Sequence, residues 1–190
     1  MIIENDLTPV AAAIRSPRLK ILLAHWRAVR GNRLMPAWRD IDALALAPIM
    51  PILWSWKYDR DTAMFTGRLA GEEINAIFGK SLRHTRMADF FKDWQYDKIY
   101  ARHRRVIGDP CIILGQGLVF SHAGREGHGE RLILPLGDDG QHGDGLIGAT
   151  IYELSQPPAP YAVPADTGAN QPISAFGEDV RYFQLGPTKR

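Results

Sequence analysis

The sequence predicts an α+β fold: one five-stranded antiparallel sheet with helices on one face, preceded by an N-terminal helix. Two observations support this expectation. The predicted elements run helix, two strands, short helices, longer helix and three strands. Within each group of strands, short polar segments separate the strands, as in hairpins. The chain has 190 residues, of which 45% are hydrophobic, so it can bury one core of its own.

The first helix is expected between Ser16, a capping residue, and Gly31, a helix-ending residue. A second apolar set, which includes Ile14 and Ile21, lies off its main apolar stripe. A helix that is apolar on two sides is usually buried by two neighbours. One neighbour is expected to be the sheet of this domain and the other a second copy of the chain, so residues 1–33 are also expected to be a dimerisation segment of a homodimer. The stripe expected to form the interface consists of Leu19, Leu22, Leu23, Trp26 and Val29.

The domain proper is expected over residues 34–154. Prolines in 34–51 predict a connector with one short helix. Residues 52–58 alternate between apolar and polar side chains and form a hairpin with 63–70. The later elements are expected to be short helices at 72–78 and 85–91, a longer helix at 94–107, and strands at 111–120, 131–136 and 146–152.

After residue 154 the composition shifts to proline and glycine. Residues 155–190 are therefore expected to form an extended, mostly irregular tail. One apolar patch within it, Val180–Leu185, is expected to pin the tail to the surface of the domain.

Composition limits the class of protein. The net charge is +2, and the basic residues of the two longer helices are interrupted, so we expect no nucleic-acid partner. No apolar stretch approaches the roughly 20 residues that span a bilayer, so no membrane association is expected. Met1–Ala13 lacks the positive charge of a signal peptide. A single cysteine, Cys111, indicates a reducing compartment, and we expect a cytoplasmic protein in which this residue is buried.

Two glycine motifs resemble nucleotide-binding patterns but fail on spacing. Gly79-Lys80-Ser81 lacks the glycine five residues before Gly79, so Gly79 is expected to end a helix. Gly115 and Gly117 lack the third glycine of a dinucleotide site. They lie within a predicted strand, and we expect a bulge there or a neighbouring group that comes close.

Metal-capable side chains occur in two predicted loops: His122, Glu126, His128 and Glu130 in one, and His142 and Asp144 in the other. The six-residue strand between these loops separates them by about 20 Å, so they cannot share one ion. No metal site is expected. No catalytic motif is recognisable either, and we expect a protein that is not an enzyme.

A candidate ligand pocket follows from strand alternation. Trp54 and Trp56 share one face of their strand, and Phe65 and Leu69 are expected to share a face of the partner strand. A fully packed core is the alternative. The predicted lining of the pocket is Trp54, Trp56, Phe65, Leu69, Ile74, Phe78, Met87, Tyr100 and Leu134.

Arg68 is the polar exception on the second strand. If this side chain is buried, it needs a carboxylate partner or several other acceptors. Asp40 and Asp42 are the candidates. We expect a structural ion pair that ties the N-terminal connector to the sheet.

Several short blocks occur in a characteristic order. They are Trp26 with Arg30-Gly31, Leu34-x-Pro36, Asp40-Ile41-Asp42, Pro51–Trp54, Phe65–Gly71 with Ile74 and Phe78-Gly79, Leu132–Leu136 and Leu146–Gly148. Together they resemble the PAS domain family, especially a bacterial variant long catalogued as a domain of unknown function. One departure is Ala43, where the family often has proline.

The resemblance implies a five-stranded PAS sheet and a stand-alone sensory or protein-interaction module of bacterial signalling. Its partner would be a signalling protein, and its ligand a small apolar molecule bound between sheet and helices. A small-molecule carrier or an uncharacterised enzyme using the same cavity is the alternative. Heme and flavin PAS domains use an axial histidine or a reactive cysteine. We expect His103 and Cys111 to be core residues here, and no heme or flavin.

Overall fold

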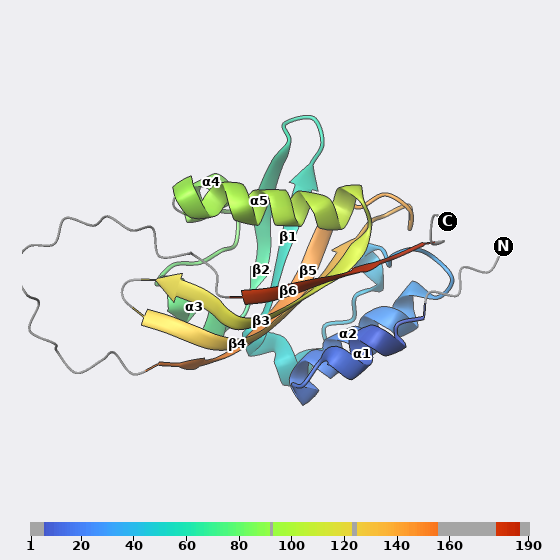
Figure 1. The fold of residues 1–190 in the computed structure, drawn as a ribbon. Helices are drawn as coiled ribbons and strands as arrows, with labels where there is room; N and C mark the ends of the chain where they lie inside the picture. The colour runs from blue at the N-terminus through green and yellow to red at the C-terminus, as the bar shows by residue number, and fades with distance from the viewer. Residues whose placement is uncertain (1–5, 92, 123–124, 156–177, 187–190) are drawn as a thin grey trace, which may run out of the picture.

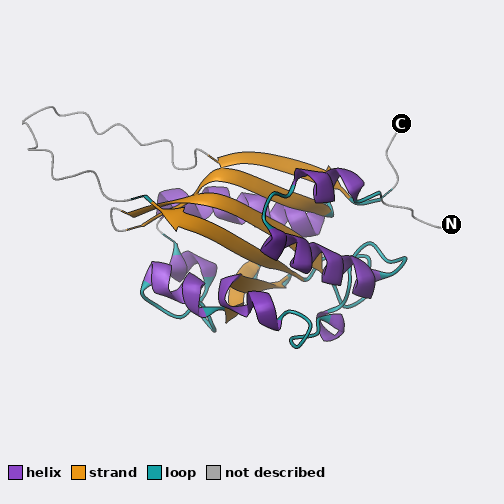
Figure 2. Cartoon of the chain, turned by 90° about the horizontal axis from the view of Figure 1, so that it is seen from below, coloured by secondary structure: helices purple, strands orange, loops and turns teal. Residues whose placement is uncertain are grey.

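The computed structural model describes residues 6–91, 93–122, 125–155 and 178–186. One six-stranded antiparallel sheet, in the order β2-β1-β5-β4-β3-β6, has helices on both faces (Figures 1 and 2). The helices are α1 Thr8–Ala13, α2 Pro17–Arg30, the 3-10 helices η1 Trp38–Asp40 and η2 Ala47–Ile52, α3 Glu72–Phe78, α4 Met87–Phe90 and α5 Asp93–Gly108. The strands are β1 Leu53–Asp59, β2 Met64–Ala70, β3 Cys111–His122, β4 Arg125–Leu136, β5 Gly145–Leu154 and β6 Glu178–Gln184.

One face of the sheet, here called the α2 face, is covered by α1 and α2 (Figure 2). Trp26 of α2 is fully buried on it, and its indole Nε1 donates a hydrogen bond to the carbonyl oxygen of Pro135 at 2.8 Å. The buried carboxylate of Glu130 on β4 accepts hydrogen bonds from the backbone N–H groups of Arg15 (3.0 Å) and Ser16 (2.6 Å). The start of α2 is thus held on the sheet by a charge-assisted contact.

The predicted dimer stripe is wrong as an interface. Leu19, Leu22, Leu23 and Trp26 are at most 4% exposed because they pack against the sheet of their own chain, and Val29 is half-buried. Residues 1–33 thus contain two helices that share the core of the domain. For the same reason, the expectation of helices on one face only is corrected to helices on both faces. The homodimer itself stays a prediction.

The sheet has one strand more than expected. The patch Val180–Leu185 docks on the domain as predicted, and β6 pairs with β3 along its whole length. The side chains of β6 alternate between the two faces of the sheet. Val180 packs against the apolar core on one face and Phe183 against the core on the other, which explains the docking. Most of the predicted irregular tail lies outside the described residues.

The opposite face, here called the α5 face, is covered by α4 and α5 (Figure 1), and Ile74 and Phe78 of α3 pack into the same core. Gly79 ends α3 in the left-handed region, with φ 63°, as predicted. The predicted loop at 121–130 is wrong, because β4 already begins at Arg125. Gly127 and Gly129 pair with β5 there. The hydrogen bonds between the strands thus hold this segment extended, although its glycine-rich composition is typical of a turn.

A bulge in β2 separates two residues that were expected to share a face. Ser55 pairs with Leu69 and Trp56 pairs with Gly67, which leaves Arg68 as the extra residue. A bulge of this kind inverts the alternation of side chains. Phe65 consequently packs on the α5 face, whereas Leu69 packs on the α2 face.

The predicted ion pair of Arg68 with Asp40 or Asp42 is also wrong. Asp40 pairs with Arg33 at 2.7 Å, and the Asp42 carboxylate accepts a hydrogen bond from the backbone N–H of Leu44. Arg68 is exposed at the bulge, and its guanidinium lies over the Trp38 ring, 4.7 Å from the ring centroid. An exposed guanidinium is solvated by water and needs no carboxylate.

Neither α2 nor any other helix in the described ranges combines the length and apolar character needed to cross a membrane.

The burial of α2 predicts a large stability effect at Leu22. Replacing Leu22 with alanine removes a fully buried side chain and should lower the free energy of unfolding by about 2–5 kcal/mol, measured by urea denaturation. Ile21→Ala, one position along the same helix but at an exposed site, should change it by less than about 0.5 kcal/mol. Equal effects of the two variants would contradict the packing of α2 described above.

Candidate ligand-binding site

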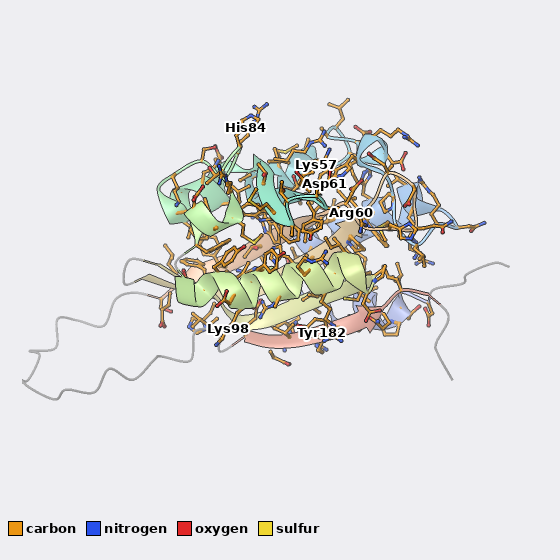
Figure 3. The ribbon with its side chains drawn as sticks, turned by 90° about the horizontal axis from the view of Figure 1, so that it is seen from above. Lys57, Arg60, Asp61, His84, Lys98 and Tyr182 are labelled. Atoms are coloured by element: carbon orange, nitrogen blue, oxygen red, sulfur yellow. The ribbon has the colours of Figure 1, made fainter. Side chains whose placement is uncertain are left out.

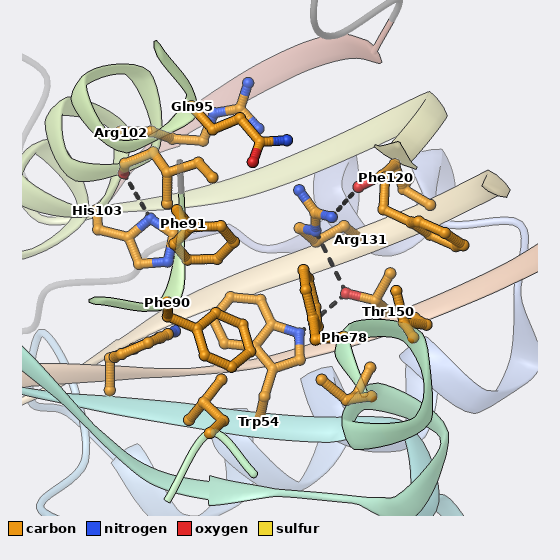
Figure 4. Close-up of a pocket in the computed structure, with 16 residues that line it drawn as sticks. Trp54, Phe78, Phe90, Phe91, Gln95, Arg102, His103, Phe120, Arg131 and Thr150 are labelled. Carbon is orange, nitrogen blue, oxygen red and sulfur yellow. Dashed lines mark hydrogen bonds between the residues drawn. The ribbon is translucent and has the colours of Figure 1, made fainter. Parts of the chain in front are cut away.

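A cavity lies between the α5 face of the sheet and the helices α3, α4 and α5 (Figure 4). Its free volume is about 60 Å³. Four strands and three helices contribute to it. The lining consists of Trp54, Trp56, Ile74, Ile77, Phe78, Leu82, Phe90, Phe91, Gln95, Ile99, Arg102, His103, Val119, Phe120, Arg131 and Thr150.

Aromatic rings form one wall of the cavity. Phe78 and Phe90 are in close contact, with ring centroids 4.6 Å apart, and Phe90 meets Phe91 edge-on at 5.1 Å. Trp56 closes the cluster against Phe90 at 5.9 Å. Edge-to-face and tilted arrangements of this kind are favourable for aromatic pairs. The wall therefore presents ring faces and edges to an apolar group in the cavity.

Trp54 is held in place by its neighbours on the sheet. Its indole Nε1 donates a hydrogen bond to Thr150 Oγ1 at 2.9 Å. Gly148 lies directly opposite Trp54 on β5, and a side chain there would collide with the indole. The glycine thus lets the ring approach β5 closely, and the hydrogen bond fixes its orientation.

The wall opposite the aromatic cluster carries two guanidinium groups. Arg131 on β4 donates from Nε to Thr150 Oγ1 (3.3 Å) and from Nη2 to the carbonyl oxygen of Val119 (Figure 4). Arg102 on α5 forms an ion pair of 2.5 Å with Glu178 of β6. Burial lowers the pKa of Arg131, and Glu178 opposes this effect by favouring the charged form. The cavity is thus apolar on one side and cationic on the other.

His103 lies at the boundary between these sides. It stacks on Trp54, with ring centroids 5.7 Å apart, and its Nδ1 lies 2.8 Å from the Ile99 carbonyl oxygen. Nδ1 therefore carries the proton and donates it to that oxygen. Burial lowers the pKa of His103 to about 3, so the ring is neutral at physiological pH.

The structure brings together four of the predicted pocket residues: Trp54, Trp56, Ile74 and Phe78. Phe65, Met87 and Tyr100 belong to the same core but do not line the cavity. The prediction was wrong for Leu69 and Leu134, which both pack on the α2 face.

The sequence interpretation missed the polar members of the lining. Arg131 and Ile133 share the α5 face because strand side chains alternate, and Leu132 and Leu134 share the other face. Applying the same period-two rule to β4 would therefore have placed Arg131 toward the cavity. No local signal points to Glu178, which reaches the site from a strand 47 positions after Arg131.

The cavity in this conformation does not fit a heme or flavin, because ligands of that size need roughly 300 Å³ or more. Within the described residues, no three metal-capable side chains gather at one point. Cys111 is buried as predicted, and burial raises the pKa of its thiol to about 11. At neutral pH the protonated thiol is a poor nucleophile.

Comparison with known families identifies this architecture. A family model of the PAS domain matches residues 14–151. The chain belongs to the PAS domain family. The resemblance inferred from the sequence blocks is thereby confirmed. No curated protein and no solved structure gives a match.

The matched range includes α2 but excludes β6. This PAS domain therefore contains Arg102, Arg131 and Thr150 within the family frame, whereas Glu178 comes from a strand beyond it.

The neutral, buried state of His103 predicts a stability that depends on pH. The folded-state pKa is below the ordinary value of 6.5, so below pH 6.5 the unfolded chain binds the proton first. Relative to His103→Phe, which cannot titrate, the wild-type protein should lose about 2 kcal/mol of unfolding free energy between pH 7 and 5. Urea denaturation at several pH values measures this difference.

His84→Asn is the matched control for loss of one imidazole. His84 points away from the protein (Figure 3), and asparagine tolerates its positive φ of 62°. This variant should follow the pH curve of the wild-type protein. A pH curve for His103→Phe that coincides with that of the wild-type protein would show that His103 is not held neutral by burial.

Proposed function

We propose that this PAS domain is a sensory module of bacterial signalling that binds a small molecule in the cavity between the sheet and α3–α5. The observation that carries the proposal is the cavity itself: an aromatic wall facing a few convergent polar groups. This combination is characteristic of small-molecule sites. A pure interaction domain has no need of buried guanidinium groups beside an internal space.

We further propose that the domain binds its ligand without converting it. Among the described lining residues, the one hydroxyl group, that of Thr150, accepts hydrogen bonds from Trp54 and Arg131. His103 donates its Nδ1 proton to a helix carbonyl and lies against Trp54, away from that hydroxyl in Figure 4. No pair of nucleophile and base therefore supports covalent catalysis among these residues.

The signal would leave the domain through a protein partner or a second copy of the chain. The cytoplasm remains the proposed location, because the single cysteine, Cys111, is suited to a reducing compartment.

Filling the cavity should abolish binding. Ile77 lines the cavity from α3 and is half-buried, so Ile77→Trp has room to adjust while its ring enters the cavity. Native mass spectrometry of the wild-type protein purified from its own host should show a stoichiometric bound mass, and Ile77→Trp should lack it. Ile21→Trp makes the same change on the exposed side of α2 and should retain the mass. An empty wild-type protein would favour a pure interaction module.

A further inference from the structure

The ion pairs behind the cavity are incomplete. The side chain of Glu178 is fully buried, and its Oε2 forms ion pairs with both guanidinium groups, Arg102 at 2.5 Å and Arg131 at 3.7 Å. Its other oxygen, Oε1, is buried without a hydrogen-bond partner among the described residues. A buried carboxylate oxygen without a donor is costly, typically by several-fold to a hundredfold in an equilibrium. Within the described part of the chain, the Glu178 carboxylate thus lacks a hydrogen-bond donor for one of its two oxygens in this position.

Arg131 also has donor capacity left. Its Nε and Nη2 bond to Thr150 and Val119, whereas Nη1 is 3.7 Å from the nearest Glu178 oxygen, too far for a hydrogen bond. Within the described residues Nη1 makes no hydrogen bond. A guanidinium prefers a carboxylate that accepts two parallel hydrogen bonds. The arrangement therefore suits a carboxylate placed on the cavity side of Arg131 better than it suits Glu178.

The rest of the cavity determines the body of such a ligand. The aromatic wall of Trp56, Phe78, Phe90 and Phe91, together with Trp54, favours an apolar or aromatic group. The free volume of about 60 Å³ limits that group to a few carbon atoms unless the helices move outward. The two guanidinium groups at the opposite wall favour an anionic end.

We propose that the ligand is a small carboxylate with an apolar body, whose carboxylate group replaces Glu178 at Arg102 and Arg131 and thereby loosens β6 from the edge of the sheet. This proposal rests on the proposed function and names the ligand class. β6 is suited to respond, because among the described strands it lies at the sheet edge and pairs with β3 alone. Loss of the Glu178 contact removes a buried anchor at the start of this strand. Release of β6 would change the surface that a partner meets.

Two pairs of probes test the ligand class: butyrate against butyramide, and benzoate against benzamide. Each pair has nearly the same shape but differs in charge. Isothermal titration of the full chain should give at least about tenfold tighter binding of one carboxylate than of its amide, because hydrogen bonds between charged groups are stronger than neutral ones. Arg102→Gln should remove this preference. Arg104→Gln should retain it, since Arg104 lies two positions along the same helix but stacks on Tyr58, outside the cavity lining.

Two further variants test the competition with Glu178. Glu178→Gln removes the charge of the internal carboxylate. Gly115→Ala leaves both arginines intact, but its new methyl group collides with the Glu178 carboxylate and displaces it. Each should raise carboxylate affinity by about tenfold and leave amide affinity unchanged. In the wild-type protein, hydrogen exchange of the β6 amides should accelerate when the carboxylate binds.

The outcomes separate this proposal from the proposed function. Equal binding of carboxylate and amide, or unaltered exchange in β6 on saturation, would overturn the carboxylate proposal while leaving ligand binding intact. If no probe binds but mass spectrometry of the protein from its host shows a bound molecule that is not a carboxylate, only the ligand class is overturned. No binding of any probe together with an empty protein would overturn both.

Discussion

The structure depends on a sheet that is buried on both faces. Along β4, Leu132 and Leu134 point to the α2 face, whereas Arg131 and Ile133 point to the α5 face. Both faces carry apolar side chains, and exposing these to water costs free energy. Each face therefore needs its own helical cover. The α2 cover is dense and leaves Leu22 and Trp26 fully buried. The α5 cover leaves a cavity.

The cavity and the buried arginine are connected features. Arg131 takes a position that an apolar residue would otherwise fill, and its guanidinium needs acceptors in a region where helices exclude water. Thr150 and the Val119 carbonyl supply two acceptors from neighbouring strands. The Glu178 carboxylate of β6 adds an ion pair at 3.7 Å but no hydrogen bond. Thr150 also orients Trp54, so the same hydroxyl joins the cationic side of the cavity to its aromatic side. This coupling makes the site a unit with one defined geometry.

β6 extends the family frame in a way that bears on function. The match to the PAS domain ends at residue 151, whereas the strand that carries Glu178 lies beyond it. The two arginines therefore belong to the family frame, and their carboxylate partner belongs to an addition. A contact that joins the two parts at a buried charge is suited to couple occupancy of the cavity to the state of the sheet edge.

The spacing of apolar residues locates α2, α5 and five strands along the chain, because helices and strands repeat with different periods. It misses the first six residues of β4, which begins at Arg125. The same alternation placed Trp54 and Trp56 together, and it would have placed Arg131 beside them. Three features appear only in the folded chain: which faces the helices cover, the bulge at Arg68 that turns Leu69 to the α2 face, and the ion pair between Glu178 and Arg131. These features depend on contacts between segments far apart in the chain, and no local pattern encodes such pairings. The stripe of α2 shows the difference most clearly: its periodicity identified a buried face, but only packing could show that the neighbour was the sheet of the same chain.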